Sequence, residues 1–394
     1  MNYESIVCRR MADVPPSGIR KFFDIVSEMK DAISLGVGEP DFTTPWAYSD
    51  AAIYSLRQGH THYTSNWGLI ELRRAIAGYL ARRFETAYDP KDEILVTVGA
   101  SEGIDLALRA LVEPGDEVIA PDPTYVSYAP GIAFAGGKCV PLKTRAEDDF
   151  RMTPEALRAC LSPKTKALIL PYPNNPTGGV MGREDLEKIA AVLADTNVIV
   201  ISDEIYAELT YGARKHVSFA SIPGMWERTI TLSGFSKAFA MTGWRLGYAC
   251  APRELAALMC KIHQFTMLCA PIAGQYAALE ALKIGADNDY ADVATMVRAY
   301  DRRRRLVVEG FNQMGLDCFE PLGAFYAFPS VKKTGMTSQE FCQGLLKEQK
   351  VAAVPGDAFG AGGEGHFRVS YAASAEKLAE ALERIGRFLE KHRG

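Results

Sequence analysis

The chain alternates between short apolar runs and longer stretches in which apolar residues recur with helical spacing. Apolar runs of four or five residues, most of them rich in β-branched side chains, lie at 94–98, 117–120, 167–170, 198–202 and 229–232 and predict buried strands. Apolar residues three and four positions apart follow most of these runs and predict helices. Strands that alternate with helices are typical of an α/β fold with a mostly parallel central sheet flanked by helices.

The predicted helices carry their apolar residues on one face. They lie at 18–29, 51–58, 71–84, 104–111, 184–194, 253–265, 272–282, 339–347 and 375–391. Near the C-terminus, further apolar runs at 323–328 and 367–372 predict two more strands. We therefore expect a large unit built on the main sheet and a smaller α/β unit that contains the C-terminal helix.

Composition and charge limit the class of protein. The 394 residues suffice for two domains with a large core, and 48% hydrophobic with 23% charged residues is usual for a globular enzyme. A formal net charge of -4 gives no electrostatic reason to expect nucleic acid or an anionic membrane surface as a partner. The 8 cysteines include no C-x-x-C pair, so we expect neither a metal site nor a disulfide framework.

The location of the protein can also be predicted. The first residues do not form a signal-peptide pattern, and no uninterrupted apolar run is long enough to cross a bilayer. We expect a cytoplasmic enzyme.

One lysine stands out chemically. Lys237 and Arg245 are the only charged residues in the small and apolar stretch 233–247, which follows the strand predicted at 229–232. A lysine in a partly dry site loses some preference for its charged form, and a neutral amine can form a Schiff base with an aldehyde. A nearby arginine can hold a phosphate with two parallel hydrogen bonds. The pair suggests pyridoxal phosphate, although a surface lysine and an ordinary ion pair explain the stretch alone equally well.

The stretch 233–247 resembles the lysine signature of class I aminotransferases, which are pyridoxal-phosphate enzymes of fold-type I. The loop 171–179 (PYPNNPTGG) resembles a second signature of this family. The segments 17–23 and 38–42 resemble the aspartate, aromatic and N-acetyl-diaminopimelate branch. The resemblance extends from about residue 18 to the C-terminal helix.

The resemblance also implies a division of the chain. We expect an N-terminal arm at 1–17, a large cofactor-binding domain at 49–285, and a small domain formed jointly by 18–48 and 286–394. It implies a homodimer as well, in which Tyr63 reaches the cofactor phosphate of the neighbouring subunit. A packed loop tyrosine is the alternative for Tyr63.

The resemblance implies a set of cofactor-binding residues around Lys237. They are Ala100, Ser101, Glu102, Tyr125, Asn175, Asp203, Tyr206, Ser233, Arg245 and Tyr63. The helix predicted after Gly99 would present free N–H groups to a phosphate, although Ser101 could equally be a simple helix cap. In the family, the residue at Tyr125 stacks on the cofactor ring, and those at Asn175 and Tyr206 bond its phenolic oxygen.

Asp203 has a role that its position suggests independently. It follows an unbroken apolar run, so its carboxylate is expected to be partly buried and to need a cationic partner. A protonated pyridine nitrogen is such a partner, and a helix cap is the alternative. Asn175, Asp203 and Lys237 are 28 and 34 residues apart, which leaves room for a crossover and a strand in each gap. Their loops can therefore meet at one edge of the sheet.

For the substrate, the resemblance implies Gly38, Asn175 and Arg368. Arg368 stands alone among mostly apolar residues, so it is either paired with a structural acid or free to hold a carboxylate with two hydrogen bonds. In the family this arginine binds the α-carboxylate of the substrate, and the loop at Gly38 lies over it. Arg20 could reach a second carboxylate of the substrate or form a surface ion pair.

The expected function is transfer of an amino group between an amino acid and a 2-oxo acid, with 2-oxoglutarate as the expected acceptor and Lys237 as the catalytic base. A carbon–sulfur β-lyase of the same fold would keep the same cofactor residues and is an open alternative. A regulator with a DNA-binding segment is disfavoured, because about 17 residues before the first family-like helix are too few for a helix-turn-helix.

Overall fold

A computed structural model of the protein describes residues 1, 3, 6–12, 14, 15, 29 and 31–392. Almost all of the helix predicted at 18–29, and Arg20 with it, lie outside the described residues. Among the residues described, no helix is long and apolar enough to span a membrane.

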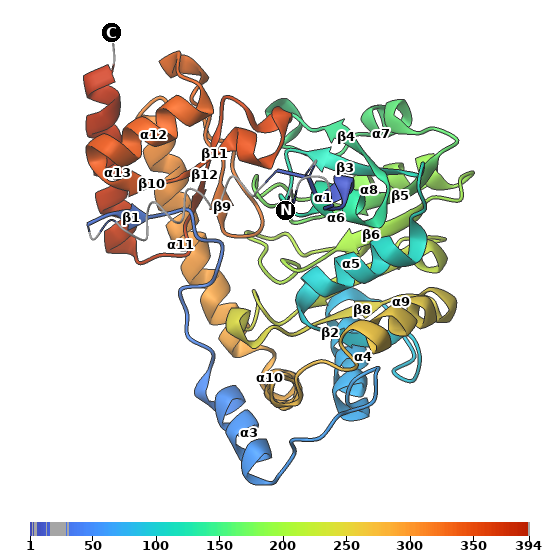
Figure 1. Ribbon diagram of the computed structural model, residues 1–394. Coiled ribbons are helices and arrows are strands. Elements are labelled where there is room, and N and C mark those ends of the chain that lie inside the picture. Colours follow the sequence, from blue (N-terminus) through green and yellow to red (C-terminus); the bar gives the residue numbers. More distant parts are fainter. Residues whose placement is uncertain (2, 4–5, 13, 16–28, 30, 393–394) are drawn as a thin grey trace.

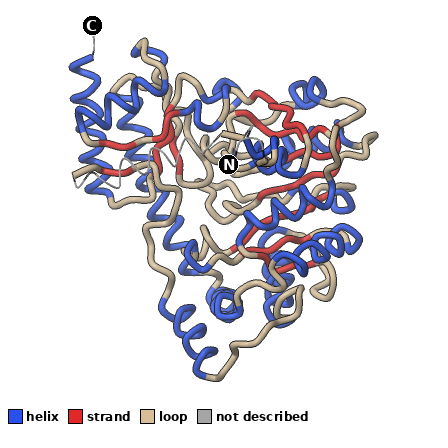
Figure 2. Tube along the Cα trace, viewed as in Figure 1, coloured by secondary structure: helices blue, strands red, loops and turns tan. Residues whose placement is uncertain are grey.

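A sheet of seven strands lies at the centre of the larger part of the described chain (Figures 1 and 2). Its order is β2-β8-β7-β6-β5-β3-β4; only β8 runs antiparallel to its neighbours, β2 and β7. The bounds are β2 Ile94–Thr97, β3 Glu117–Asp122, β4 Lys138–Lys143, β5 Thr165–Leu170, β6 Ile199–Asp203, β7 Thr229–Gly234 and β8 Gly247–Cys250. The mostly parallel sheet predicted from the sequence is confirmed.

Helices cover both faces of this sheet. The helices α5, α6 and α9 pack on one face; α7 and α8, with α4 and α10, pack on the other. The bounds are α3 Trp46–Arg57, α4 Ile70–Phe84, α5 Gly99–Leu111, α6 Tyr128–Ala135, α7 Pro154–Cys160, α8 Arg183–Leu193, α9 Arg253–Thr266 and α10 Ile272–Asn288. The short helix α1 (Arg9–Ala12) lies near α6 (Figure 1).

The strands of the central sheet consist of continuous apolar runs because helices cover both faces of the sheet. In β5, Ala167 and Ile169 pack under α5 and α6, whereas Leu168 and Leu170 pack under α7 and α8. Successive side chains of a strand point to opposite faces, so a strand between two helical layers needs apolar residues at every position.

As far as the described residues go, the smaller part combines two small sheets with three helices. β1 pairs with β10, and β9, β12 and β11 form an antiparallel sheet. The bounds are β1 Ile33–Ser34, β9 Tyr326–Ala327, β10 Val351–Ala352, β11 Val354–Pro355, β12 Phe367–Ser370, α11 Ala291–Gln313, α12 Ser338–Gln349 and α13 Ala375–His392. Segments from both ends of the chain therefore build one core, because β1 lies beside β10 (Figure 1).

Several predicted elements differ from the structure. The helix predicted at 51–58 begins five residues earlier, at Trp46, and the one predicted at 272–282 continues to Asn288. The helix predicted at 104–111 begins five residues earlier, at Gly99, because this glycine adopts a left-handed backbone (φ 74°) and turns the chain directly out of β2. Ser101 therefore lies inside the first turn and does not cap it. The strand predicted at 323–328 is reduced to β9, since Ala324 is also left-handed (φ 58°) and interrupts the extended backbone.

The direction of the strands places the chemically interesting loops together. β2, β3, β5, β6 and β7 run parallel to one another, so the loops at their carboxyl ends all meet at the same edge of the sheet. The smaller part of the chain faces this edge (Figure 1).

Candidate active site

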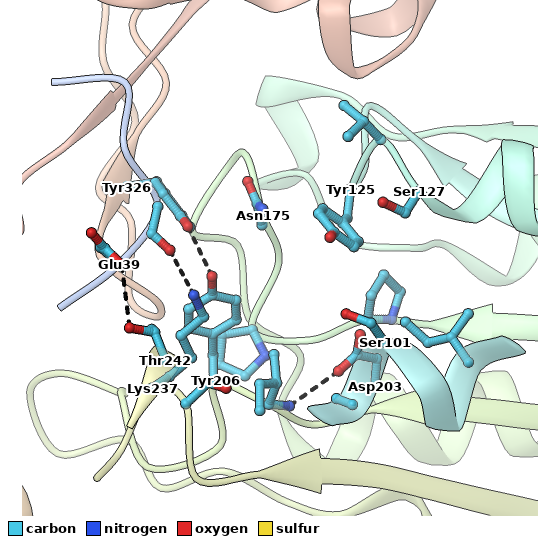
Figure 3. A pocket seen from close by; sticks show the side chains of 18 of the residues that line it. Glu39, Ser101, Tyr125, Ser127, Asn175, Asp203, Tyr206, Lys237, Thr242 and Tyr326 are labelled. Carbon is cyan, nitrogen blue, oxygen red and sulfur yellow. Dashed lines mark hydrogen bonds between the residues drawn. The ribbon is translucent and has the colours of Figure 1, made fainter. Parts of the chain in front are cut away.

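A cavity of about 750 Å³ lies at this edge. The loops after β2, β3, β5, β6 and β7 form one side, and the segment 37–39 with residues of β9 and β12 forms the other (Figure 3). The predicted site residues that line it are Gly38, Ala100, Ser101, Tyr125, Asn175, Asp203, Tyr206, Lys237, Arg245 and Arg368. The structure therefore brings together most of the set that the sequence singled out.

Lys237 lies in the loop after β7, with its side chain partly buried. Its Nζ donates a hydrogen bond to the backbone carbonyl of Gly38 at 2.6 Å (Figure 3). Burial, with the positive charge of Arg368 as the next largest cause, lowers the pKa of Lys237 from 10.5 to about 8. Roughly a tenth of such amines are neutral at pH 7, against fewer than one in a thousand for an ordinary lysine. This fits a nucleophilic or basic role.

Asp203 is the last residue of β6, and its carboxylate is buried. Oδ2 accepts a hydrogen bond from the Tyr128 hydroxyl at 2.7 Å, and Oδ1 accepts one from the backbone N–H of Ile205 at 3.2 Å. Burial raises the pKa of Asp203, and these two hydrogen bonds oppose the rise. Both donors are neutral, so the carboxylate can still pair with a cationic group of a ligand.

One end of the cavity suits an anion. Ala100 and Ser101 lie in the first turn of α5, where backbone N–H groups have no partner inside the helix and the helix dipole is positive. Arg245 reaches the same place, because a Cβ added to Gly99 would lie only 2.8 Å from Arg245 Nη2. Its Nη1 donates to the backbone carbonyl of Thr242 at 3.0 Å. A phosphate fits this combination of donors.

Arg368 is a buried cation that forms no ion pair with any acid in the described part of the chain. Nη1 donates to Asn175 Oδ1 at 2.8 Å, Nη2 donates to the Gly36 carbonyl at 2.6 Å, and Nε has no partner among the described residues. The guanidinium lies 4.4 Å from the ring centre of Tyr326 and 4.8 Å from that of Phe359. Neutral groups hold its position and leave its charge for a ligand carboxylate.

Polar aromatic side chains complete the cavity. Tyr206 and Tyr326 are buried and share a hydrogen bond between their hydroxyl groups at 2.8 Å (Figure 3). Tyr125 lines the cavity with its ring edge-to-face against Tyr128. Because Asn175 Oδ1 is occupied by Arg368, its amide N–H groups are available to donate to a ligand.

Three predicted cofactor residues lie outside the cavity lining. Glu102 turns away from the cavity and pairs with His263 on α9. The Ser233 hydroxyl donates to the backbone carbonyl of Glu204 at 3.3 Å. The side chain of Tyr63 is 82% exposed on the surface of the chain. Tyr63 therefore does not reach the cavity of its own subunit.

Two tyrosines that the sequence did not single out contact the candidate groups. Tyr128 bonds Asp203, and Tyr326 contacts both Tyr206 and Arg368. Tyr128 could have been noticed, since it lies three residues beyond Tyr125, at the start of α6. Nothing in the sequence connects Tyr326 with Tyr206, because their contact depends on the packing of the two parts of the chain.

The free groups of the cavity match the parts of pyridoxal phosphate. The neutral form of Lys237 suits its aldehyde, the N-terminus of α5 with Arg245 suits its phosphate, and Asp203 suits its ring nitrogen. Arg368 is then left over as a cation for the carboxylate of a substrate. The residues present therefore fit this cofactor and an amino acid at the same time.

Comparison with known proteins gives the same answer. The family model for aminotransferases of class I and II matches residues 30–385. The chain is 48% identical to an aspartate aminotransferase of Pyrococcus abyssi (97% of this chain, 98% of the relative) and 44% identical to aromatic-amino-acid aminotransferase 2 of Thermococcus litoralis (97% and 98%). The solved aspartate aminotransferase of Thermus thermophilus with maleate superposes with a TM-score of 0.92 at 38% identity, covering 97% of this chain and 99% of that one.

The chain belongs to the class I and II aminotransferases, the fold-type I enzymes that use pyridoxal phosphate to move amino groups between amino acids and 2-oxo acids. The expected family, fold, cofactor and enzyme class are confirmed. The β-lyase and the regulator considered from the sequence are not supported by these relatives.

Proposed function

We propose that Lys237 carries the cofactor in this aminotransferase and that Arg368 binds the α-carboxylate of its amino acid substrate. The observation that carries this proposal is that both cations line one cavity, where Lys237 has a lowered pKa and Arg368 has no acidic partner among the described residues. The Arg368 guanidinium can hold a carboxylate in a fixed position near the Lys237 amine.

The remaining residues would hold the cofactor. Ala100, Ser101 and Arg245 would bind the phosphate, and Asp203 would pair with the ring nitrogen, supported by Tyr128. Tyr125, Asn175 and Tyr206 would contact the ring and its phenolic oxygen. Pyridoxal phosphate, when bound, supplies an aldehyde for the amino group and a ring that accepts electrons from the α-carbon.

Lys237 would also move the proton. Once its Nζ is free, the Lys237 amine, with a pKa of about 8, can take a proton from the substrate α-carbon and donate it again in a later step. Asp203 would keep the ring nitrogen protonated, because its carboxylate has no cationic partner in the described part of the chain. The loop at Gly38 lies against Lys237 Nζ and helps to exclude water.

The proposed amino donors are aspartate, an aromatic amino acid or a diaminopimelate-type compound, with 2-oxoglutarate as acceptor. The names of the relatives support aspartate and aromatic substrates. In the described part of the lining, the cations are Lys237, Arg245 and Arg368, so none remains for a second carboxylate. A dicarboxylic substrate would need a cation from outside this set, for example Arg20 or a residue of a partner subunit.

We also propose a homodimer, a large domain at 49–285 and a small domain at 18–48 and 286–394. The exposed Tyr63 supports the dimer, and the shared core of β1 with the C-terminal helices supports the small domain. We also propose the cytoplasmic location that the sequence predicts.

The test is a half-reaction followed by absorbance. The purified enzyme is mixed with single amino acids, and loss of the absorbance of the bound cofactor is compared with the yield of 2-oxo acid. With aspartate or an aromatic amino acid, we expect the amount of cofactor that loses its absorbance to equal the amount of 2-oxo acid formed. Adding 2-oxoglutarate should restore the absorbance. Pyruvate and ammonia from cysteine or cystathionine, with unchanged cofactor absorbance, would instead identify a lyase.

The variant Lys237→Ala tests the central residue. It is expected to lose turnover by several orders of magnitude, because neither the amine nor a proton acceptor remains at this place. Circular dichroism should show an unchanged fold. Normal turnover in a folded Lys237→Ala protein would refute the assignment.

A further inference from the structure

A buried acid–base pair lies directly behind the phosphate end of the cavity. His263 on α9 is fully buried, and its Nδ1 lies 2.7 Å from Oε1 of Glu102 in the first turns of α5. The two helices pack side by side on the same face of the sheet (Figure 1). An ionised carboxylate can only accept hydrogen bonds, so His263 Nδ1 carries the proton and donates it to Glu102.

Glu102 connects this pair to the start of α5. Its second oxygen, Oε2, accepts a hydrogen bond from the backbone N–H of Val98 at 2.5 Å. Val98 is the N-cap residue, and Ala100 and Ser101, which line the cavity, follow it within three positions. Both oxygens of the carboxylate are thus directed away from the cavity and toward protein donors.

The histidine is not explained by packing. Its Nε2 is buried and has no hydrogen-bond partner among the described residues, which is unfavourable for a polar atom. An apolar side chain of similar size would avoid this cost. The contact that favours histidine here is the one from Nδ1 to Glu102.

We propose that His263 is a positioning residue for the phosphate subsite: its Nδ1–H holds the Glu102 carboxylate on the Val98 N–H, turned away from the cavity, so that the first turn of α5 stays attractive to a phosphate. A carboxylate within one turn of a phosphate site repels the anion when it turns toward it. The repulsion by Glu102 would weaken binding of the phosphate group and would not affect binding of the pyridine ring. The proposal rests on the proposed placement of the phosphate at Ala100, Ser101 and Arg245.

The test compares two ligands that differ only in the phosphate. Apoenzyme of the wild type, His263→Leu and the double variant E102Q/H263L is titrated with pyridoxal phosphate and with pyridoxal, and the ratio of the two affinities is measured by tryptophan fluorescence. His263→Leu is expected to lower this ratio about tenfold, because the carboxylate released from its donor can turn toward the phosphate and opposes only that group. The double variant is expected to restore the ratio to within about twofold of wild type, since the charge is gone.

A second histidine–glutamate pair provides a matched control. His216 Nε2 lies 2.9 Å from Glu204 Oε2, and both side chains are almost fully buried. Glu204 follows Asp203, at the ring end of the cavity. His216→Leu is therefore expected to change the affinities for pyridoxal phosphate and pyridoxal by the same factor and to leave their ratio unchanged.

The outcomes separate the possible failures. An unchanged ratio in His263→Leu, an equal loss for both ligands, or no recovery in the double variant would overturn the role of His263. A wild type that binds pyridoxal as tightly as pyridoxal phosphate would instead overturn the placement of the phosphate itself. If His263→Leu does not fold, His263→Gln replaces it, because a glutamine amide reaches the Nε2 position and leaves Glu102 without its donor.

Discussion

At the scale of single residues, the site is defined by charges that the chain leaves without a counterion. Asp203 is held by two neutral donors, and Arg368 by two oxygens of amide groups. Buried charges of this kind are costly for the isolated protein, and pairing with a ligand recovers part of that cost. The same residues therefore weaken the apoenzyme and strengthen its complex with cofactor and substrate.

The lowered pKa of Lys237 predicts a pH-dependent reactivity of the apoenzyme. Reductive methylation of Lys237 by formaldehyde, followed by mass spectrometry of its peptide, should increase with pH with a midpoint near 8, because only the neutral amine reacts. Other lysine peptides of the digest serve as the internal control and should continue to increase at higher pH. A midpoint above 10 for Lys237 would contradict the effect of burial.

The same shift has a consequence for stability. Folded apoenzyme binds this proton less tightly than the unfolded chain, whose lysine has a pKa near 10.5. The unfavourable contribution of Lys237 is complete below pH 8 and is lost as the pH rises from about 8 to 10.5. Loss of this unfavourable contribution should therefore raise the free energy of unfolding of the apoenzyme as the pH increases through that interval.

Replacement of Arg368 by lysine should separate substrate binding from cofactor binding. A single ammonium cannot reproduce the planar pair of donors, so KM for the amino acid is expected to rise by about one to two orders of magnitude. The affinity for pyridoxal phosphate should change by less than about threefold, because Arg368 is at the substrate side. Equal losses for cofactor and substrate would argue against this division of roles.

At the scale of elements, the phosphate end depends on a close contact between the start of α5 and the start of β8. A Cβ on Gly247 would lie 2.5 Å from the backbone nitrogen of Ala100 and 2.6 Å from the carbonyl carbon of Gly99. These are main-chain atoms, which cannot move aside as a flexible side chain does. The glycine therefore fixes how deeply the first turn of α5 sits against the sheet.

Gly247→Ala is expected to destabilise the enzyme by about 1–3 kcal/mol and to weaken pyridoxal phosphate binding, since the helix start must shift. Thermal unfolding of the apoenzyme and titration with the cofactor measure the two effects. Gly78→Ala is the control, because Gly78 lies inside α4 with no heavy atom near the added Cβ. It should be neutral or stabilising by up to about 1 kcal/mol.

For the molecule as a whole, the position of Tyr63 is informative. Tyr63 is not among the residues that line the cavity of its own chain. Its side chain is exposed, and the segment that carries it is fixed from within: Asn66 Nδ2 donates to the Leu268 carbonyl at 2.7 Å, and Gln275 accepts from the Leu69 N–H at 2.7 Å. A segment held this firmly, with an aromatic side chain pointing outward, is suited to contact a second subunit.

Mixed dimers test whether Tyr63 acts on the neighbouring site. Subunits with Tyr63→Ala are mixed with subunits with Lys237→Ala under exchange conditions, and aminotransferase activity is measured. One site of each mixed dimer then has an intact Lys237 and an intact Tyr63 from the other chain. Activity is expected to rise well above the sum of the parents, toward half of wild type per mixed dimer. No gain on mixing would show that Tyr63 acts within its own chain or not at all.

Most of the local structure and the identity of the reactive groups could be predicted from the amino-acid sequence alone. Apolar runs between helices predicted the mostly parallel sheet, because a strand covered on both faces must be apolar throughout. Lys237 and Arg368 could be recognised as candidates because each is a charge set among mostly apolar or small residues, and Asp203 because it follows an apolar run. The family signature around Lys237 added the cofactor.

How these groups interact depends on the folded chain and could not be predicted from the sequence. The lowered pKa of Lys237 depends on burial and on Arg368, which is 131 positions away in the chain. Tyr326 reaches Tyr206, and His263 reaches Glu102, through the packing of distant segments that no local pattern reports. The sequence pattern records which residues prefer to be buried, whereas partners, distances and charge balance arise only when separate elements meet.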